Sequence, residues 1–175
     1  MTDLSDSIQA RPGRLAVASR EFNTLLLATI VAIAAFVALR SAAPEIATAD
    51  ARIYLDRFMG FSWPFFVAVS VFLLYVIGAW LVAIFGLGPP RRWDGLGHAL
   101  HWTAEACPLV GLLTTFLSLL TALLVYGEAG PGNPGTQAAF ITQFAIAFGS
   151  SIAGGVLALI AFTLHRLLPQ DVAER

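Results

Sequence analysis

The sequence predicts an all-α membrane protein with four transmembrane helices. Of its 175 residues, 58% are hydrophobic and only 12% are charged, and the mean hydropathy is +0.78. A soluble domain carries about 25% charged residues, so this composition is typical of a membrane protein instead. Apolar windows of about 20 residues mark membrane helices, and the chain has four of them. The net charge of −1 argues against a nucleic-acid partner.

The first two windows define residues 23–87, which we expect to hold two spans joined by a short periplasmic loop. The first window runs from about Thr24 to Leu39, after a polar segment (residues 1–22) expected to be cytoplasmic. A cleaved signal peptide is the alternative reading of this window. The long region before it contains acidic residues, and cleavage after Ala43 would leave Pro44 beside the cut, so we favour a retained span.

The last two windows lie close together, at about residues 108–126 and 138–164. The segment before them, residues 88–105, is predicted to be a cytoplasmic helical loop, because its apolar side chains recur at helical spacing after two prolines. We expect this helix to continue into the third span, with a kink at Pro108. Residues 167–175 form the predicted cytoplasmic tail.

The arginines predict the orientation of the spans. Cytoplasmic segments of membrane proteins are enriched in basic residues. An orientation with both chain ends on the cytoplasmic side places more of the arginines in cytoplasmic segments than the opposite orientation does, so we favour it. With that orientation, Trp93 and Trp102 are expected near the inner membrane interface. The segments placed inside then hold Arg11, Arg14, Arg20, Arg91, Arg92, Arg166 and Arg175.

A stripe of small and hydroxylated residues follows the third span. Gly111, Thr114, Thr115, Ser118 and Ala122 have i, i+3, i+4, i+7 spacing and therefore share one helix face. One interpretation is helix packing, because small residues let membrane helices approach closely. The other is a narrow polar crevice, because hydroxyls both donate and accept hydrogen bonds.

The fourth span has a similar stripe, and the same two interpretations apply to it. A single chain would expose both stripes to lipid, so we expect an oligomer. None of the four spans contains Asp, Glu, Lys, Arg or His. Proton relays use ionisable groups at depth, so a proton pathway would need such a group from another chain. The stripe on the fourth span comprises Gln143, Ala147, Ser150, Ser151, Gly154 and Ala158.

Two motifs resemble those of the MotA/TolQ/ExbB proton-channel family. Residues 106–116, ACPLVGLLTTF, are similar to the family stretch A-P-L-L-G-L-L-G-T-V, with Pro108, Gly111 and Thr115 at its Pro, Gly and Thr. Residues 147–154, AFGSSIAG, are similar to A-L-x-T-T-A-x-G on the next helix. The resemblance defines a channel core over residues 106–166.

The resemblance implies a homopentamer in the bacterial inner membrane, with the last two, long helices forming the inner ring of the pentamer. It also implies a partner similar to ExbD, TolR or MotB, with one membrane helix that carries a protonatable Asp. Family members act as channel and stator subunits of proton-driven motors, so no enzyme activity and no cofactor are expected. Thr115 and Ser151 would face the partner's carboxylate. The rest of the predicted ion pathway is Thr114, Ser150, Ser118 and Gln143.

Several features depart from the family pattern. Thr114 replaces a Gly, Ser150 and Ser151 replace two Thr, and Gly155 replaces the usual Leu. The large cytoplasmic domain of flagellar members is missing, so the sequence does not identify the driven process. The sequence also does not decide between protons and sodium ions. The residues expected to pack or kink the helices are Pro108, Gly111, Gly154 and Gly155.

Two alternatives belong to other functional classes. The first is an oligomeric scaffold in lipid that conducts nothing and uses its polar faces for packing alone. The second is a membrane metal-binding protein that uses His98, His101 and Glu105, which follow i, i+3, i+7 spacing on a predicted helix. The single cysteine, Cys107, excludes an intrachain disulfide and is expected to be a buried, inert thiol.

Overall fold

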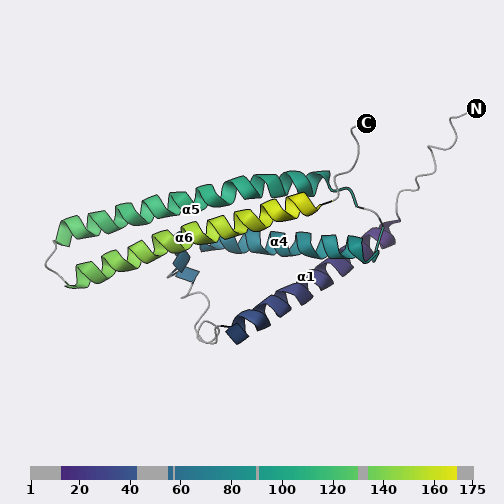
Figure 1. Ribbon diagram of the computed structural model, residues 1–175, viewed down its shortest axis with the longest axis horizontal. Helices are drawn as coiled ribbons and strands as arrows, with labels where there is room; N and C mark the ends of the chain where they lie inside the picture. The colour runs from purple at the N-terminus through teal and green to yellow at the C-terminus, as the bar shows by residue number, and fades with distance from the viewer. Residues whose placement is uncertain (1–12, 43–54, 57, 90, 130–133, 169–175) are drawn as a thin grey trace, which may run out of the picture.

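Four long helices make up the described part of the chain, which is all-α as predicted (Figure 1). Each is long and apolar enough to cross a membrane, which indicates a multi-pass membrane protein. The computed structural model describes residues 13–42, 55–56, 58–89, 91–129 and 134–168. The elements are α1 (Arg14–Ala42), the 3-10 turn η2 (Gly60–Ser62), α4 (Trp63–Ile84), α5 (Asp94–Ala129) and α6 (Pro134–Leu167).

Helices α1, α5 and α6 extend beyond the apolar windows that predicted them, whereas α4 ends at Ile84, three residues before the predicted end of its span. Helix α1 begins at Arg14, well before the apolar window, because nothing between Gly13 and the window breaks a helix. The predicted extension of the third span is confirmed, since α5 is one helix of 36 residues. Pro108 lies inside α5 without ending it. Most of the predicted periplasmic loop, residues 43–54, lies outside the described residues.

Helices α5 and α6 form a long antiparallel pair, and α4 lies against one half of that pair (Figure 1). Helix α1 packs against α4 near one end and then diverges from it (Figure 1). Helices α1 and α5 begin at one end of the molecule, on the right in Figure 1, and helices α4 and α6 end there. We call this the arginine-rich end, since Arg14, Arg20, Arg91, Arg92 and Arg166 lie there.

The main apolar core lies at the arginine-rich end, where α4, α5 and α6 meet. Trp93 is only 6% exposed and belongs to this core, so it does not face lipid as the predicted interfacial position would require. Trp102 is 61% exposed and does face outward. The core therefore packs Trp93, from the segment before α5, against residues of α4, α5 and α6. Its members are Leu73, Val76, Ala79, Trp93, Leu100, Ala161, Leu164 and Leu168.

The outer surfaces of all four helices are apolar. On α5, for example, Leu109, Leu113, Phe116 and Leu123 are each more than half exposed. A soluble monomer rarely presents such large apolar surfaces, whereas lipid or a neighbouring membrane subunit covers them at no cost. The distribution of side chains therefore agrees with the membrane class that the composition predicts.

Candidate functional site

Small residues bring α5 and α6 into backbone contact. A Cβ atom on Gly111 would lie 2.8 Å from the carbonyl oxygen of Ser150, and one on Gly154 would lie 2.5 Å from that of Cys107. Only glycine permits approaches this close, so the packing role predicted for these two glycines is visible in their contacts. We call this contact line the α5–α6 seam. Its buried members include Cys107, Gly111, Thr114, Ser118, Ala122, Ala147, Ser150, Gly154 and Ala161.

Three hydroxyl residues of the predicted pathway are buried inside the seam. Thr114 is 1% exposed and donates from Oγ1 to the carbonyl oxygen of Val110 at 2.9 Å. Ser150 is fully buried, and its Oγ lies 3.0 Å from the carbonyl oxygen of Ala147. Ser118 is 6% exposed. Hydroxyls that bond to helix carbonyls cost little in an apolar interior, so Thr114 and Ser150 contribute to packing.

Thr115 and Ser151 form a hydroxyl pair across the seam. Their Oγ1 and Oγ atoms lie 2.6 Å apart, and either atom can be the donor. Thr115 Oγ1 also lies 2.9 Å from the carbonyl oxygen of Gly111 and 2.8 Å from that of Ala147. Both side chains are half-buried, so they lie at the edge of the seam. The structure thus brings together the two residues that the motifs single out.

The hydroxyl pair lies on the side of the seam away from α4. On α6, Gly149 faces the segment before α4, because a Cβ there would lie 2.1 Å from the carbonyl oxygen of Phe58. Two residues along a helix correspond to a rotation of about 200°, so Ser151 points nearly opposite to Gly149. A Cβ on Gly155, one turn beyond Ser151, would meet open space. We call the surface with Thr115, Ser151 and Gly155 the free face.

The other predicted site residues divide between the seam and the outer surface. Gln143 is half-buried on α6, two turns before Ser151. Pro108 is exposed on α5. Gly155 packs against nothing within the described part of the chain, in contrast to Gly154. A packing role for Gly155 therefore needs a neighbouring molecule and stays a prediction.

A single chain does not expose both polar stripes to lipid, so the expectation of an oligomer on that ground is wrong. Instead the two stripes cover each other, because Gly111 and Gly154 let the helices close and Thr114 and Ser150 are buried between them. Of the hydroxylated residues in the two stripes, Thr115 and Ser151 remain half-exposed, and they lie on the free face.

The histidine-based metal site does not form. His101 Nε2 lies 3.3 Å from Glu105 Oε1, and both side chains are more than half exposed. The ring of His101 lies 5.8 Å from that of His165, whereas His98 is exposed. Over the described ranges, no three His, Cys, Asp or Glu side chains gather closely enough to hold a metal ion. The metal hypothesis therefore lacks the geometry it needs.

A charged cluster between α1 and α4 was not predicted. Tyr75 Oη donates to Glu21 Oε2 at 2.7 Å, and Arg91 Nη2 donates to Tyr75 Oη. Arg20 Nη2 donates to Glu21 Oε1 at 2.9 Å. The guanidinium of Arg91 also lies over the ring of Tyr75, 5.1 Å from its centre. We call Arg20, Glu21, Tyr75 and Arg91 the Glu21 cluster.

Sequence offered only one weak signal for this cluster, a tyrosine in the uncharged second span. Tyr75 lies 54 positions from Glu21 and 16 from Arg91, so spacing alone could not join them. Comparison of the chain with protein-family models, with curated proteins and with solved structures finds no match.

Proposed function

We propose that this protein is a channel and stator subunit of an ion-driven motor in the bacterial inner membrane. In this proposal five copies surround a single-span partner whose membrane helix carries a protonatable Asp. The observation that carries the proposal is the hydroxyl pair of Thr115 and Ser151, with oxygens 2.6 Å apart, on the free face of the seam. The two family-like motifs meet at this pair.

A neutral lining suits a carboxyl group that must gain and lose a proton. An arginine or lysine beside a buried Asp would favour its charged form and hold it there. The chain offers no Asp, Glu, Lys, Arg or His within residues 108–126 or 138–164, the apolar cores of α5 and α6. The titrating group must then come from the partner, and this protein supplies hydrogen bonds without charge.

The hydroxyl pair can serve both protonation states of the partner's carboxyl. A hydroxyl donates one hydrogen bond and accepts up to two. When Thr115 donates to the carbonyl of Ala147 and Ser151 donates to Thr115, the oxygen of Ser151 is left to accept from a protonated carboxyl. When Thr115 donates to Ser151 instead, the hydrogen of Ser151 is left for a charged carboxylate. The two arrangements differ only by rotation of two O–H bonds.

The free face also supports oligomerisation. Gly155 beside the hydroxyl pair presents bare backbone, and the surface there is open in the single chain. Lipid gives such a surface no hydrogen-bond partner, whereas a ring of subunits would turn it towards a central cavity. The number five comes from the family resemblance alone.

A non-conducting oligomeric scaffold is the second candidate. The burial of Thr114, Ser118 and Ser150 in the seam favours it, because a packing role requires side chains buried between the two helices. The scaffold hypothesis gives the Thr115–Ser151 pair no task beyond joining two helices. A measurement of ion flux separates the two candidates.

The test is partner-dependent proton flux into vesicles that contain the full-length protein and its partner. Thr115→Val and Ser151→Ala should each reduce flux by about 10-fold or more while the assembly stays intact, if the hydroxyls contact the carboxyl during transfer. Thr121→Val and Thr142→Val are matched controls, because both hydroxyls are exposed and bond only to their own helices. Unchanged flux in Thr115→Val and Ser151→Ala would favour the scaffold.

A further inference from the structure

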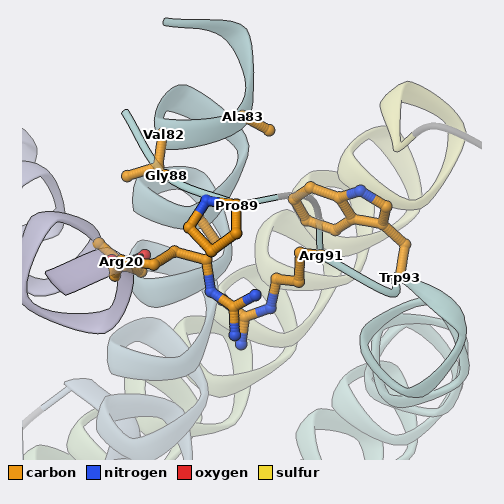
Figure 2. A pocket seen from close by; sticks show the side chains of 9 residues that line it. Arg20, Val82, Ala83, Gly88, Pro89, Arg91 and Trp93 are labelled. Carbon is orange, nitrogen blue, oxygen red and sulfur yellow. Dashed lines mark hydrogen bonds between the residues drawn. The ribbon is translucent and has the colours of Figure 1, made fainter. Parts of the chain in front are cut away.

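A cavity of about 280 Å³ lies at the arginine-rich end, between α1, α4 and the turn that leads to α5 (Figure 2). Arg20 and Thr24 of α1 line it on one side, and Ala83 of α4 lines it on another. Arg91 and Trp93, from the segment after α4, complete its wall. A water molecule needs about 10–15 Å³ by the same measure, so the cavity has room for a larger polar group.

Among the described residues, two guanidinium groups and one carboxylate gather beside the cavity. Glu21 pairs with Arg20 at 2.9 Å, and its other oxygen lies 3.8 Å from Arg91 Nη1. One carboxylate therefore faces two guanidinium groups, whose side chains are only 15% and 17% exposed. Water screens charges poorly at such sites. Arginine guanidinium groups held beside a cavity favour an anion in it.

Arg91 has a donor that the protein leaves unused. Its Nη1 atom is buried and makes no hydrogen bond with any described residue. Its Nη2 atom, in contrast, donates to Tyr75, and the stacking on the tyrosine ring fixes the orientation of the guanidinium. A buried charged donor without an acceptor costs free energy, and an anionic oxygen in the cavity would remove that cost.

We propose that this cavity binds a phosphate group, supplied by the headgroup of an anionic phospholipid. Planar guanidinium groups match the oxygens of phosphate, which is why arginine is preferred at phosphate sites. The cavity lies where four membrane-length helices begin or end, which is the level of the lipid headgroups. Trp93 and Ala83 give it apolar walls beside the guanidiniums. An anionic lipid would then hold α1 against α4 through the Glu21 cluster.

The test measures the thermal unfolding midpoint of the full-length protein in a neutral detergent. Phosphatidylglycerol is titrated in one series, phosphatidylcholine in a second, and inorganic phosphate without lipid in a third. Phosphatidylglycerol should raise the midpoint, and phosphatidylcholine should not. Stabilisation by inorganic phosphate to the same extent would overturn the assignment to lipid. No stabilisation by phosphatidylglycerol would overturn the site itself.

Two pairs of variants locate the effect. Arg91→Gln should weaken phosphatidylglycerol binding by about 10-fold, which is the scale of one charge-assisted hydrogen bond. The neighbouring Arg92 is exposed, so Arg92→Gln should retain wild-type binding. Ala83→Phe should fill the cavity and abolish binding with both arginines in place, while Ile84→Phe, which does not line it, serves as the control. Equal losses in Arg91→Gln and Arg92→Gln would contradict the proposal, since general electrostatic attraction predicts that result.

The Ala83→Phe variant tests the cavity without removing any hydrogen bond of the Glu21 cluster. Arg91→Gln also breaks a bond to Tyr75 and lowers stability for that reason, but Ala83 is an exposed helix residue. Mass spectrometry of co-purified lipid supplies a second readout that needs no thermal transition. We expect phosphatidylglycerol to be enriched on the wild-type protein and on Ile84→Phe, and to be lost from Ala83→Phe. Equal enrichment on Ala83→Phe and Ile84→Phe would place the lipid elsewhere.

Discussion

The hydroxyls of Thr115 and Ser151 touch across two helices, 36 residues apart in sequence and 2.6 Å apart in space. Each comes from one of the two motifs that resemble a proton-channel family. The contact needs Gly111 and Gly154, because any larger residue at either position would force α5 and α6 apart. A small-residue seam thus positions a hydroxyl pair, and that relationship leads to testable consequences.

The first prediction concerns the pair itself. A double-mutant cycle with Thr115→Val and Ser151→Ala should give a favourable coupling energy of about 0.6 kcal/mol, the average for hydrogen bonds between membrane helices. Unfolding of the purified protein in mixed detergents measures it. The same cycle with Thr121→Val in place of Thr115→Val should give no coupling, because Thr121 bonds to Leu117 of its own helix. Strict additivity of the Thr115 and Ser151 variants would show that the pair is not formed.

The second prediction concerns two adjacent glycines. Gly154→Ala should lower the free energy of unfolding by about 1–3 kcal/mol, the usual cost of overpacking, because its Cβ would lie 2.5 Å from the carbonyl oxygen of Cys107. Gly155→Ala should change stability little, since its Cβ would meet open space within the chain. Thermal unfolding of both variants checks this. Equal effects at the two positions would mean that α6 is rotated relative to the described seam.

The third prediction concerns the Glu21 cluster. Tyr75→Phe removes a hydroxyl that donates to Glu21 and accepts from Arg91. We expect a loss of about 1.5–3 kcal/mol in the free energy of unfolding, the range for hydrogen bonds to charged groups. Tyr126→Phe is the matched control, because the described residues show no hydrogen bond to its hydroxyl. A Tyr75→Phe protein as stable as Tyr126→Phe would show that α1 does not dock on α4 through this cluster.

The fourth prediction concerns Cys107, which is fully buried in the seam. Its thiol should not react with a maleimide in the folded protein and should react completely after denaturation, because access limits the reaction. His101→Cys in a Cys107→Ala background gives a positive control, since the His101 side chain is 58% exposed. Rapid labelling of Cys107 in the native protein would contradict the tight contact between α5 and α6.

Much of the fold follows from hydropathy and helical spacing. Four apolar windows predicted four helices, and four described helices are long and apolar enough to cross a membrane, although α4 ends at Ile84, before the predicted end of the second span at residue 87. Helical periodicity also placed Gly111, Thr114 and Ser118 on one face of α5, and all three are buried together. These properties are local, so a single sequence reveals them. Helix ends were less well predicted, because polar residues continue a helix beyond the apolar stretch, as at Arg14.

The contacts between faces could not be predicted in the same way. Periodicity shows which residues share a face, but it does not show what that face meets. The stripes on α5 and α6 therefore suggested exposure to lipid, whereas they cover each other. The Glu21 cluster illustrates the same limit, because Glu21, Tyr75 and Arg91 come from three separate segments and meet only after folding.

The most direct measurement is imaging of the purified protein with its single-span partner, at a resolution that shows side chains. We predict a ring of five copies whose free faces surround one central cavity, with Thr115 and Ser151 pointing towards the partner's membrane carboxyl. A structure in which Thr115 and Ser151 face lipid, with no cavity between subunits, would contradict the proposed function.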